Sequence, residues 1–359
     1  MNRKISHLML FAVLLFSATQ LKAQQFWSSI ESSDFAQQKK EIYQKENFPT
    51  KYQLLTLETS SFQQELKRST NEKSVLIFLP NSEGVLQRFQ VKESSNFSIE
   101  LQEKFPNINA YTAKGIDDPT AVAKLSFGTD GFHGVIFSAM QETVYIDPYS
   151  KDNKAYITYK RNSLNAIDED FKCQVEDSAK NDFSFTNSFK NADDGKLRTY
   201  KLALVCSGEY AQFHLGAGQQ NIPTTASDAV KKAAVLSAMN TSVTRLNGIF
   251  EKDLSVKLEL VANNDEVIFL DENTDNITDG DPDAMIDEVQ TICDNVIGNA
   301  NYDIGHIFSV GGDGLAGLGV VCVTGQKARG VTGRSQPVGD PYDIDFVAHE
   351  MGHQFKANH

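Results

Sequence analysis

Three histidines near the C-terminus constrain the fold of this chain more than any other feature of its sequence. His349 and His353 lie in the pattern H-E-x-x-H, and His359 follows six residues later. Side chains four residues apart lie on one face of an α-helix, so the first two histidines can bind one metal ion, with Glu350 beside them. Asp340, which precedes a proline, indicates where this helix begins. The chain must therefore form a helix here and then bring His359 back to the same point.

These residue types predict a catalytic zinc site. Neutral imidazoles suit zinc, and three protein ligands leave one coordination position open for water, so we predict that His349, His353 and His359 bind one zinc ion. Zinc lowers the pKa of that water and polarises a peptide carbonyl. Glu350 is placed to act as general base, accepting the proton and returning it to the leaving amine. The alternative is a chance spacing with His359 on the surface, but five specified positions in a helical context argue against it.

The N-terminus has the pattern of a secretory signal over residues 1–23. Arg3 and Lys4 precede an apolar stretch from Leu8 to Ala18, and a polar segment leads to Ala23. We therefore expect a secreted protein, extracellular or exported across the inner membrane. No later segment approaches the ~20 apolar residues of a membrane-spanning helix, so no membrane association is expected.

Beyond the signal, the hydrophobic pattern predicts two folded units. Residues 24–173 contain short runs of period two between turn residues, which predicts a mainly β domain. Residues 174–196 are polar and form the expected linker and processing region, with a cut near Lys196 or Arg198. From residue 197 to 359, strands and helices alternate, which predicts an α/β domain with a largely parallel sheet.

Two helices of the second unit are expected from their apolar stripes. The first covers residues 226–248, carries Asn240 and Asn247 on its stripe, and has Gly248 as its expected end. The second covers residues 282–296 and follows the N-cap residue Asp281.

The charge balance excludes some partners. The formal net charge of −13 provides no broad basic surface to neutralise phosphates, so neither nucleic acid nor an anionic membrane surface is an expected partner. One acidic segment has oxygen ligands suited to calcium, although their order does not match an EF-hand, and a solvated acidic loop is the favoured interpretation. Its carboxylates are Asp275, Asp279, Asp281 and Asp283.

The four cysteines allow more than one interpretation. Cys173, Cys206, Cys293 and Cys322 can pair in three ways, and their spacing is not that of a structural zinc site. Disulfides persist outside the cytosol, so one or two disulfide bonds are favoured in an exported protein. His306, in an apolar strand, is predicted to be a core residue with satisfied hydrogen bonds.

From about residue 199 to 359 the sequence resembles the reprolysin-like, or adamalysin-like, metzincins, and closely their bacterial secreted relatives. The segments that carry the resemblance, besides the histidine motif, are residues 202–211, 300–306 and 327–333. The preceding part resembles the propeptide of that family, through residues 115–119 and 145–149. The resemblance implies a metzincin-like catalytic domain with a mixed, mostly parallel twisted sheet, preceded by a mainly β propeptide domain.

The resemblance also implies roles for single residues. His349, His353 and His359 match the family's zinc ligands, and Glu350 matches its catalytic base. Cys173 lies where related zymogens often place a thiolate on the zinc, so a zymogen switch stands beside the disulfide as its alternative. Cys322 matches a cysteine that pairs after the active-site helix, beyond residue 359. Residues 311–323 resemble the edge strand that pairs with extended substrates.

The sequence departs from the family's motif at Lys356, where the family has glycine, and the catalytic domain is expected to continue past His359. If the turn is kept, Lys356 is strained in the left-handed region; otherwise the helix runs on and His359 points away. We thus predict a zinc endopeptidase precursor that acts on proteins or peptides and is inhibited by its own propeptide. The alternative is a secreted binding or adhesion protein on a catalytically weakened scaffold.

Overall fold

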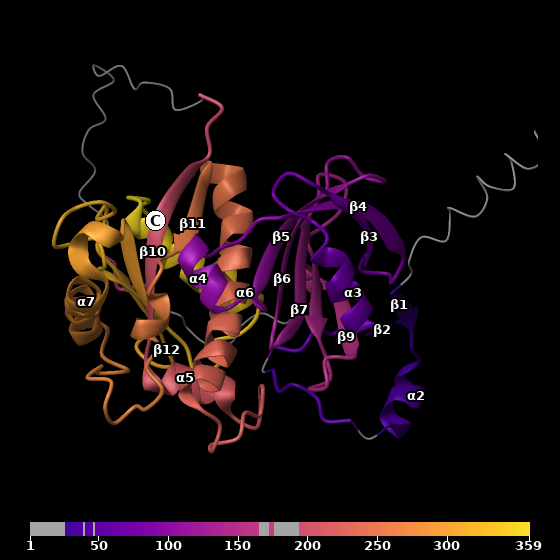
Figure 1. The fold of residues 1–359 in the computed structure, drawn as a ribbon, viewed down its shortest axis with the longest axis horizontal. Coiled ribbons are helices and arrows are strands. Elements are labelled where there is room, and N and C mark those ends of the chain that lie inside the picture. Colours follow the sequence, from indigo (N-terminus) through magenta and orange to yellow (C-terminus); the bar gives the residue numbers. More distant parts are fainter. Residues whose placement is uncertain (1–25, 39, 46, 165–171, 176–193) are drawn as a thin grey trace, which may run out of the picture.

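A computed structural model describes residues 26–38, 40–45, 47–164, 172–175 and 194–359. The predicted signal, residues 1–23, lies outside the described residues, as does most of the predicted linker, so both stay predictions. The described chain forms two β-sheets on either side of one long helix, α6 (Asp228–Leu254) (Figure 1). None of the helices in the described ranges is long and apolar enough to cross a membrane.

The N-terminal sheet has nine strands, and every neighbouring pair is antiparallel. Its strands are, in spatial order, β1 (Trp27–Ser29), β2 (Gln53–Leu57), β9 (Ala155–Lys160), β8 (Val144–Pro148), β7 (Gly131–Phe137), β6 (Val122–Gly128), β5 (Asn109–Gly115), β4 (Leu86–Glu93) and β3 (Val75–Pro80). Three short helices accompany it: α2 (Ser32–Gln37), α3 (Thr59–Leu66) and α4 (Ile99–Lys104). The β-rich pattern of the sequence is therefore realised as one antiparallel sheet.

The period of two in β6 gives this sheet two different faces. Leu125 and Phe127 point into an apolar core that Phe62 of α3 completes. Lys124 and Ser126, which alternate with them, point to the opposite face and form hydrogen bonds with side chains of α6. One face of the sheet therefore packs in the core of the N-terminal unit, and the other face contacts α6 of the C-terminal unit.

The C-terminal sheet has five strands and is mostly parallel. In spatial order they are β11 (Val256–Leu260), β10 (Arg198–Cys206), β12 (Ile304–Ser309), β14 (Gly330–Gly333) and β13 (Gly314–Ala316). Three neighbouring pairs are parallel, and β13 runs antiparallel to β14. The expected mixed, mostly parallel sheet is therefore present.

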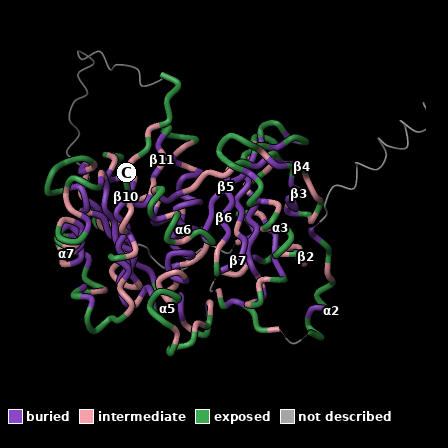
Figure 2. The backbone as a smooth tube through the Cα atoms, viewed as in Figure 1, coloured by how far each residue is buried: buried purple, intermediate pink, exposed green. Residues whose placement is uncertain are grey.

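Helices cover both faces of this sheet. Leu204 in β10 faces the core under α6, whereas the neighbouring Val205 faces the core under α7 (Pro282–Ile292). Figure 2 shows that the buried residues follow the strands of both sheets. The remaining helical segments are α5 (Gly208–Leu215), η2 (Asn264–Val267), the π-helix η3 (Cys293–Gly298), η4 (Asn299–Asn301), the π-helix η5 (Pro341–Ala348) and α8 (His349–Gln354). The short 3₁₀ turn η1 (Arg161–Ser163) follows β9.

Two sequence predictions for α6 are wrong. The helix does not end at Gly248 but continues to Leu254, where Ser255 adopts the left-handed conformation. Gly248 is needed for close packing, because a Cβ atom there would lie 2.7 Å from the ring of Phe137. Asn247 does not belong to an apolar stripe either, since its side chain forms hydrogen bonds with the backbone of Leu258.

The favoured disulfide interpretation is also wrong within this chain. All four cysteines lie in described residues, and no disulfide bond joins any two of them. Cys206 is buried in the core under α6, and Cys293 is buried in the core under α7, so the sheet separates these two thiols. Cys322 is exposed, and its pairing with a residue beyond 359 stays a prediction.

Candidate metal centre

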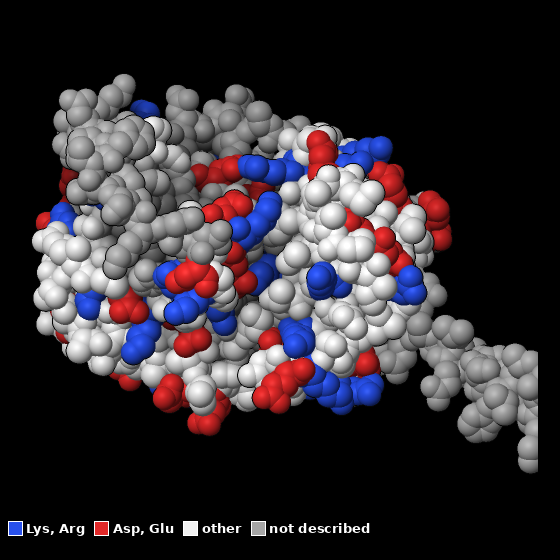
Figure 3. All heavy atoms as spheres, turned by 90° about the horizontal axis from the view of Figure 1, so that it is seen from above, with Lys and Arg blue, Asp and Glu red and all other residues white. Residues whose placement is uncertain are grey.

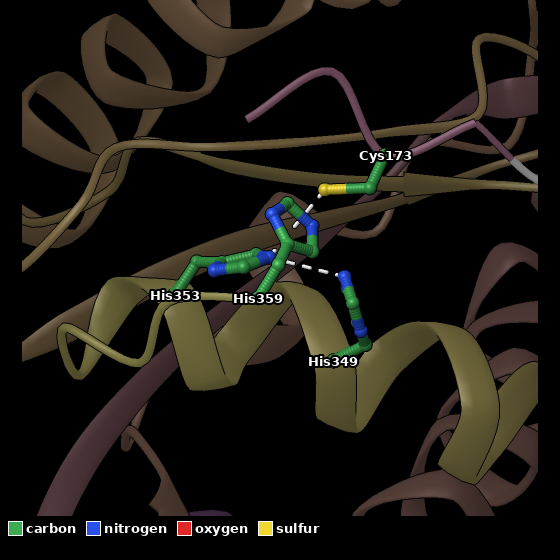
Figure 4. A group of neighbouring side chains, drawn as sticks. All are labelled: Cys173, His349, His353 and His359. Atoms are coloured by element: carbon green, nitrogen blue, oxygen red, sulfur yellow. Dashed lines mark hydrogen bonds between the residues drawn. The ribbon is translucent and has the colours of Figure 1, made fainter. Parts of the chain in front are cut away.

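The helix formed by η5 and α8, which carries the histidine motif, is held against the sheet by its apolar residues. Val347 and Met351, four residues apart, are fully buried in the core under α6 together with Tyr342. This packing turns the opposite face of the helix, which carries His349 and His353, toward Cys173, as Figure 4 shows. The local sequence therefore decides which side chains the helix offers for binding a metal.

A tight turn after α8 returns the chain to the metal centre. Lys356 has φ of 78°, in the left-handed region, and its amide donates a hydrogen bond of 2.8 Å to the carbonyl of His353. The Ala357 amide donates to Gly352, and the Ala357 carbonyl lies 2.7 Å from Nδ1 of His353. The turn is thus kept with lysine in place of glycine, and the alternative in which the helix runs on is wrong.

Four side chains converge beside α8. The ring centroids of His353 and His359 are 4.6 Å apart, and those of His349 and His359 are 5.3 Å apart. Figure 4 shows Cys173 beside the three histidines, and its Sγ atom lies 3.4 Å from Nε2 of His353. One ligand atom from each of the four residues lies within 4.8 Å of the other three. The structure therefore brings together all four residues that the sequence singled out.

The chemistry of this donor set fits zinc. Imidazole nitrogen and thiolate sulfur are both zinc ligands, and zinc is usually bound by four ligands in a tetrahedron. The Ala357 carbonyl accepts from Nδ1–H of His353, which leaves the Nε2 lone pair free to face the cluster, 3.0 Å from Nε2 of His349. Burial, assisted by the neighbouring His353 and His359, lowers the pKa of His349 and so favours the neutral form that binds metals.

Cys173 reaches the histidines because its segment extends the sheet. The amide of Gln174 donates to the carbonyl of Gly314 over 2.9 Å, and the amide of Gly314 donates to Lys172 over 3.3 Å. Cys173 therefore forms a parallel bridge with Gly314 in β13, the strand at the end of the five-stranded order. Residues 172–174 occupy the sheet edge beside the metal centre.

Glu350 is buried beside these ligands. Its side chain is inaccessible to solvent, and neither carboxylate oxygen forms a hydrogen bond with any of the described residues. Burial raises the pKa of Glu350 to about 7, and the nearby thiol of Cys173 opposes this shift. A carboxylate with a pKa near the working pH is suited to accept and return a proton.

His306 is a core residue, as the sequence predicted, and its hydrogen bonds connect α8 to the sheet. Its Nδ1 lies 3.0 Å from Oε1 of Gln354 in α8, and its Nε2 lies 2.8 Å from Oγ1 of Thr332 in β14. Gln354 also donates to the carbonyl of Gly305. Sequence reasoning missed Gln354 and Thr332, and only the position of Gln354 directly after a predicted ligand hinted at a role.

Three of the four carboxylates of the acidic segment have structural roles. Asp279 accepts hydrogen bonds from Ser207 and from the backbone amides of Val310 and Gly311. Asp275 accepts from the amide of Gly208, and Asp281 caps α7, as predicted. These contacts brace the loop against β12 and α5 and lend no support to the calcium prediction.

A comparison with family models agrees with this geometry. Residues 236–359, which contain the histidine cluster, match the model described as metallo-peptidase family M12B, reprolysin-like. This segment is therefore similar to the reprolysin-like metallopeptidases. Peptidases of that family depend on zinc, so the reprolysin-like segment and the donor set of its cluster point to the same metal. Among curated proteins, none matches the chain.

Proposed function

We propose that this chain is the secreted precursor of a zinc endopeptidase, and that its N-terminal part is an inhibitory propeptide. The convergence of Cys173 with His349, His353 and His359 carries the proposal, since the family match covers the histidines but not the cysteine. The export step rests on the signal-like sequence of residues 1–23, and the bacterial secreted type rests on the resemblance.

Each residue of the centre has a separate role in this proposal. His349, His353 and His359 hold the zinc, and Cys173 takes the fourth position as a thiolate in the precursor. A zinc ion bound there supplies a Lewis acid for the peptide carbonyl and lowers the pKa of a water molecule. Glu350 accepts the proton of the attacking water and passes it to the leaving amine.

The precursor is blocked in two ways. The thiol of Cys173 lies among the histidines, where a water molecule and the scissile carbonyl must enter. The backbone of residues 172–174 is paired with β13, so it occupies the sheet edge that an extended peptide substrate needs. Processing in or near residues 174–196 separates this segment from β10 and leaves β10, which begins at Arg198, intact.

Zinc content and proteolysis together test the proposal. The full-length protein, purified and processed, should contain one zinc ion and cleave a denatured protein, and a chelator should abolish cleavage. Glu350→Gln should retain zinc but lower the cleavage rate by at least about a hundredfold, because only proton transfer is lost. The exposed Glu272→Gln is the matched control and should behave like the wild type.

Two results would contradict this function. Cleavage by Glu350→Gln at a rate close to that of the wild type would show that the general base is another group. Zinc binding by the wild type without any cleavage would instead favour a secreted binding or adhesion protein on the same scaffold.

A further inference from the structure

Helix α6 lies between the two sheets, with one face toward the N-terminal unit and the opposite face toward the C-terminal sheet (Figure 1). Met239, Val243 and Leu246 on one face belong to the core of the C-terminal sheet. The opposite face carries polar and small residues at intervals of three and four, and it lies against β5, β6 and β7. The residues of this polar face are Ser237, Asn240, Thr241, Thr244, Arg245, Gly248 and Glu251.

Side chains of the N-terminal unit complement this polar face of α6. Asn96 is buried and donates to the side chains of Asn240 and Thr244 over 3.0 and 2.7 Å. The hydroxyl of Thr241 lies 3.0 Å from that of Ser126, and it donates to Asp130 over 3.1 Å. These bonds join residues more than a hundred positions apart in the chain, so they are formed only when the two units dock.

A buried ion triad lies within the same contact. Arg245 is 3% exposed, and it donates to Asp147 of β8 over 2.6 Å and to Asp343 of η5 over 2.8 Å. Asp147 also accepts from the hydroxyl of Tyr159, 2.7 Å away. A cavity of about 60 Å³ lies beside the triad, between Lys45 of the N-terminal part and residues of the C-terminal unit. Removing Asp147 would leave the buried Arg245 paired with one carboxylate instead of two.

A second contact lies at the edge of the C-terminal sheet opposite to the one that Cys173 covers. The Ser98 amide donates to the carbonyl of Leu260 at the end of β11, and the Leu260 amide donates to Asn96 over 2.7 Å. Phe97, Leu101 and Ile108 of the N-terminal part are buried in the same core as α6 and β11. Separation of the units would expose these side chains to water, which is unfavourable.

We propose that residues 26–164 are a stable non-covalent partner of residues 198–359, held by the polar face of α6 and by the β11 edge. Cutting the linker then does not release the N-terminal unit, and release is a separate step. The inhibitory role of the N-terminal unit rests on the proposed function. Its association with the C-terminal unit does not, because neither contact includes Cys173 or the three histidines.

A cut in the linker of the full-length protein tests this inference. A recognition site for a sequence-specific protease is inserted into residues 176–193, and the cut protein is analysed by size-exclusion chromatography. The Cys173→Ser variant is treated in the same way, with a chelator present, to remove any contact through a metal. Both cut proteins should elute as one complex, and elution as two separate species would overturn the inference.

Two buried leucines provide a matched pair of variants. Leu101 and Leu66 are both fully buried, but Leu101 packs in the core under α6 and Leu66 packs in the N-terminal unit's own core. Leu101→Ala should weaken association of the cut halves by about tenfold or more in a dilution series, and Leu66→Ala should leave it nearly unchanged. Equal weakening by both variants would count against a specific interface.

A polar variant keeps the test decisive if Leu101→Ala does not fold. Asn96→Ala removes the side-chain bonds to Asn240, Thr244 and Asn247, and it should also weaken association by about tenfold. Unchanged association in a folded Asn96→Ala protein would contradict the assigned contact. Absent proteolysis by the C-terminal half after the N-terminal half has been removed would contradict the proposed function alone, because association of the halves is measured without any activity.

Discussion

At the scale of single residues, Lys356 shows how a side chain is accommodated in a conformation that favours glycine. The φ of 78° brings Cβ close to the backbone, which costs a non-glycine residue roughly 1 kcal/mol or more. Three hydrogen-bonding contacts around the turn, from Lys356 to His353, from Ala357 to Gly352 and between His353 and Ala357, hold it in place. The aliphatic part of Lys356 also lies over Gly319, where an added Cβ would be 3.2 Å from it.

We predict that Lys356→Gly stabilises the turn and tightens zinc binding in the full-length protein. The strain of the left-handed residue disappears, but the greater entropy of glycine in the unfolded chain and the lost contact with Gly319 offset part of this gain. The free energy of unfolding should therefore rise by at most about 1 kcal/mol. A gain of about 1.4 kcal/mol in zinc binding would correspond to tenfold tighter affinity. Urea unfolding and competition with a chelator measure the two quantities.

The neighbouring Ala357→Gly variant is the control for this prediction. Ala357 is not among the residues with positive φ, so glycine there only increases the conformational entropy of the unfolded chain and should destabilise the protein slightly. Equal changes in the free energy of unfolding and in zinc affinity in both variants would show that Lys356 is accommodated without strain.

At the scale of elements, the position of α8 depends on the two strands β12 and β14. His306 in β12 bridges Gln354 of α8 and Thr332 of β14, and all three side chains are fully buried. Burial lowers the pKa of His306 to about 4, so the ring is neutral at physiological pH and serves as donor on one nitrogen and acceptor on the other. A charged ring would donate from both nitrogens, but its positive charge would be buried away from water, which is unfavourable.

We predict that the His306 contact weakens in acid. Between pH 6.5, the ordinary histidine pKa, and pH 4, the unfolded chain binds a proton at this position and the folded protein does not. The contribution to stability is therefore complete above pH 6.5 and is lost as the pH falls, by at most about 1.4 kcal/mol per pH unit. With a chelator present, the free energy of unfolding should fall less steeply with decreasing pH in His306→Gln than in the wild type. Parallel curves of unfolding free energy against pH for the two proteins would rule the effect out.

At the scale of the whole molecule, the N-terminal part covers both edges of the C-terminal sheet. Residues 96–98 pair with the end of β11, and Cys173 pairs with β13. Charged side chains of both signs are interspersed over the face in Figure 3. These bridges occupy the backbone of Leu260 and Gly314, to which a third chain or a substrate would otherwise be able to pair.

We predict that Cys173→Ala makes the uncut precursor partly active on a short fluorogenic peptide, because the thiolate no longer competes with water. Activity should stay below that of the processed enzyme, since residues 172–174 still pair with β13. Glu272→Gln, the exposed control used above, should leave the uncut precursor latent. An uncut Cys173→Ala precursor as latent as the wild type would refute the switch.

The sequence by itself determined the features that depend on local periodicity. The spacing of His349 and His353 placed both on one helix face, and the same periodicity turned Val347 and Met351 into the core. The alternation in β6 and the N-cap at Asp281 were equally local, because a residue's face and its capping bond depend on neighbours a few positions away.

Only the tertiary structure decided which partners these faces meet. Cys173 contacts His353 across 180 positions, and Asn240 in α6, which sequence reasoning assigned to an apolar stripe, is bonded to Asn96 of the other unit. The left-handed Lys356 was one of two open outcomes until the contacts of its turn selected it. Periodicity reports whether a face is buried, but the identity of the covering segment depends on long-range packing, which no local spacing encodes.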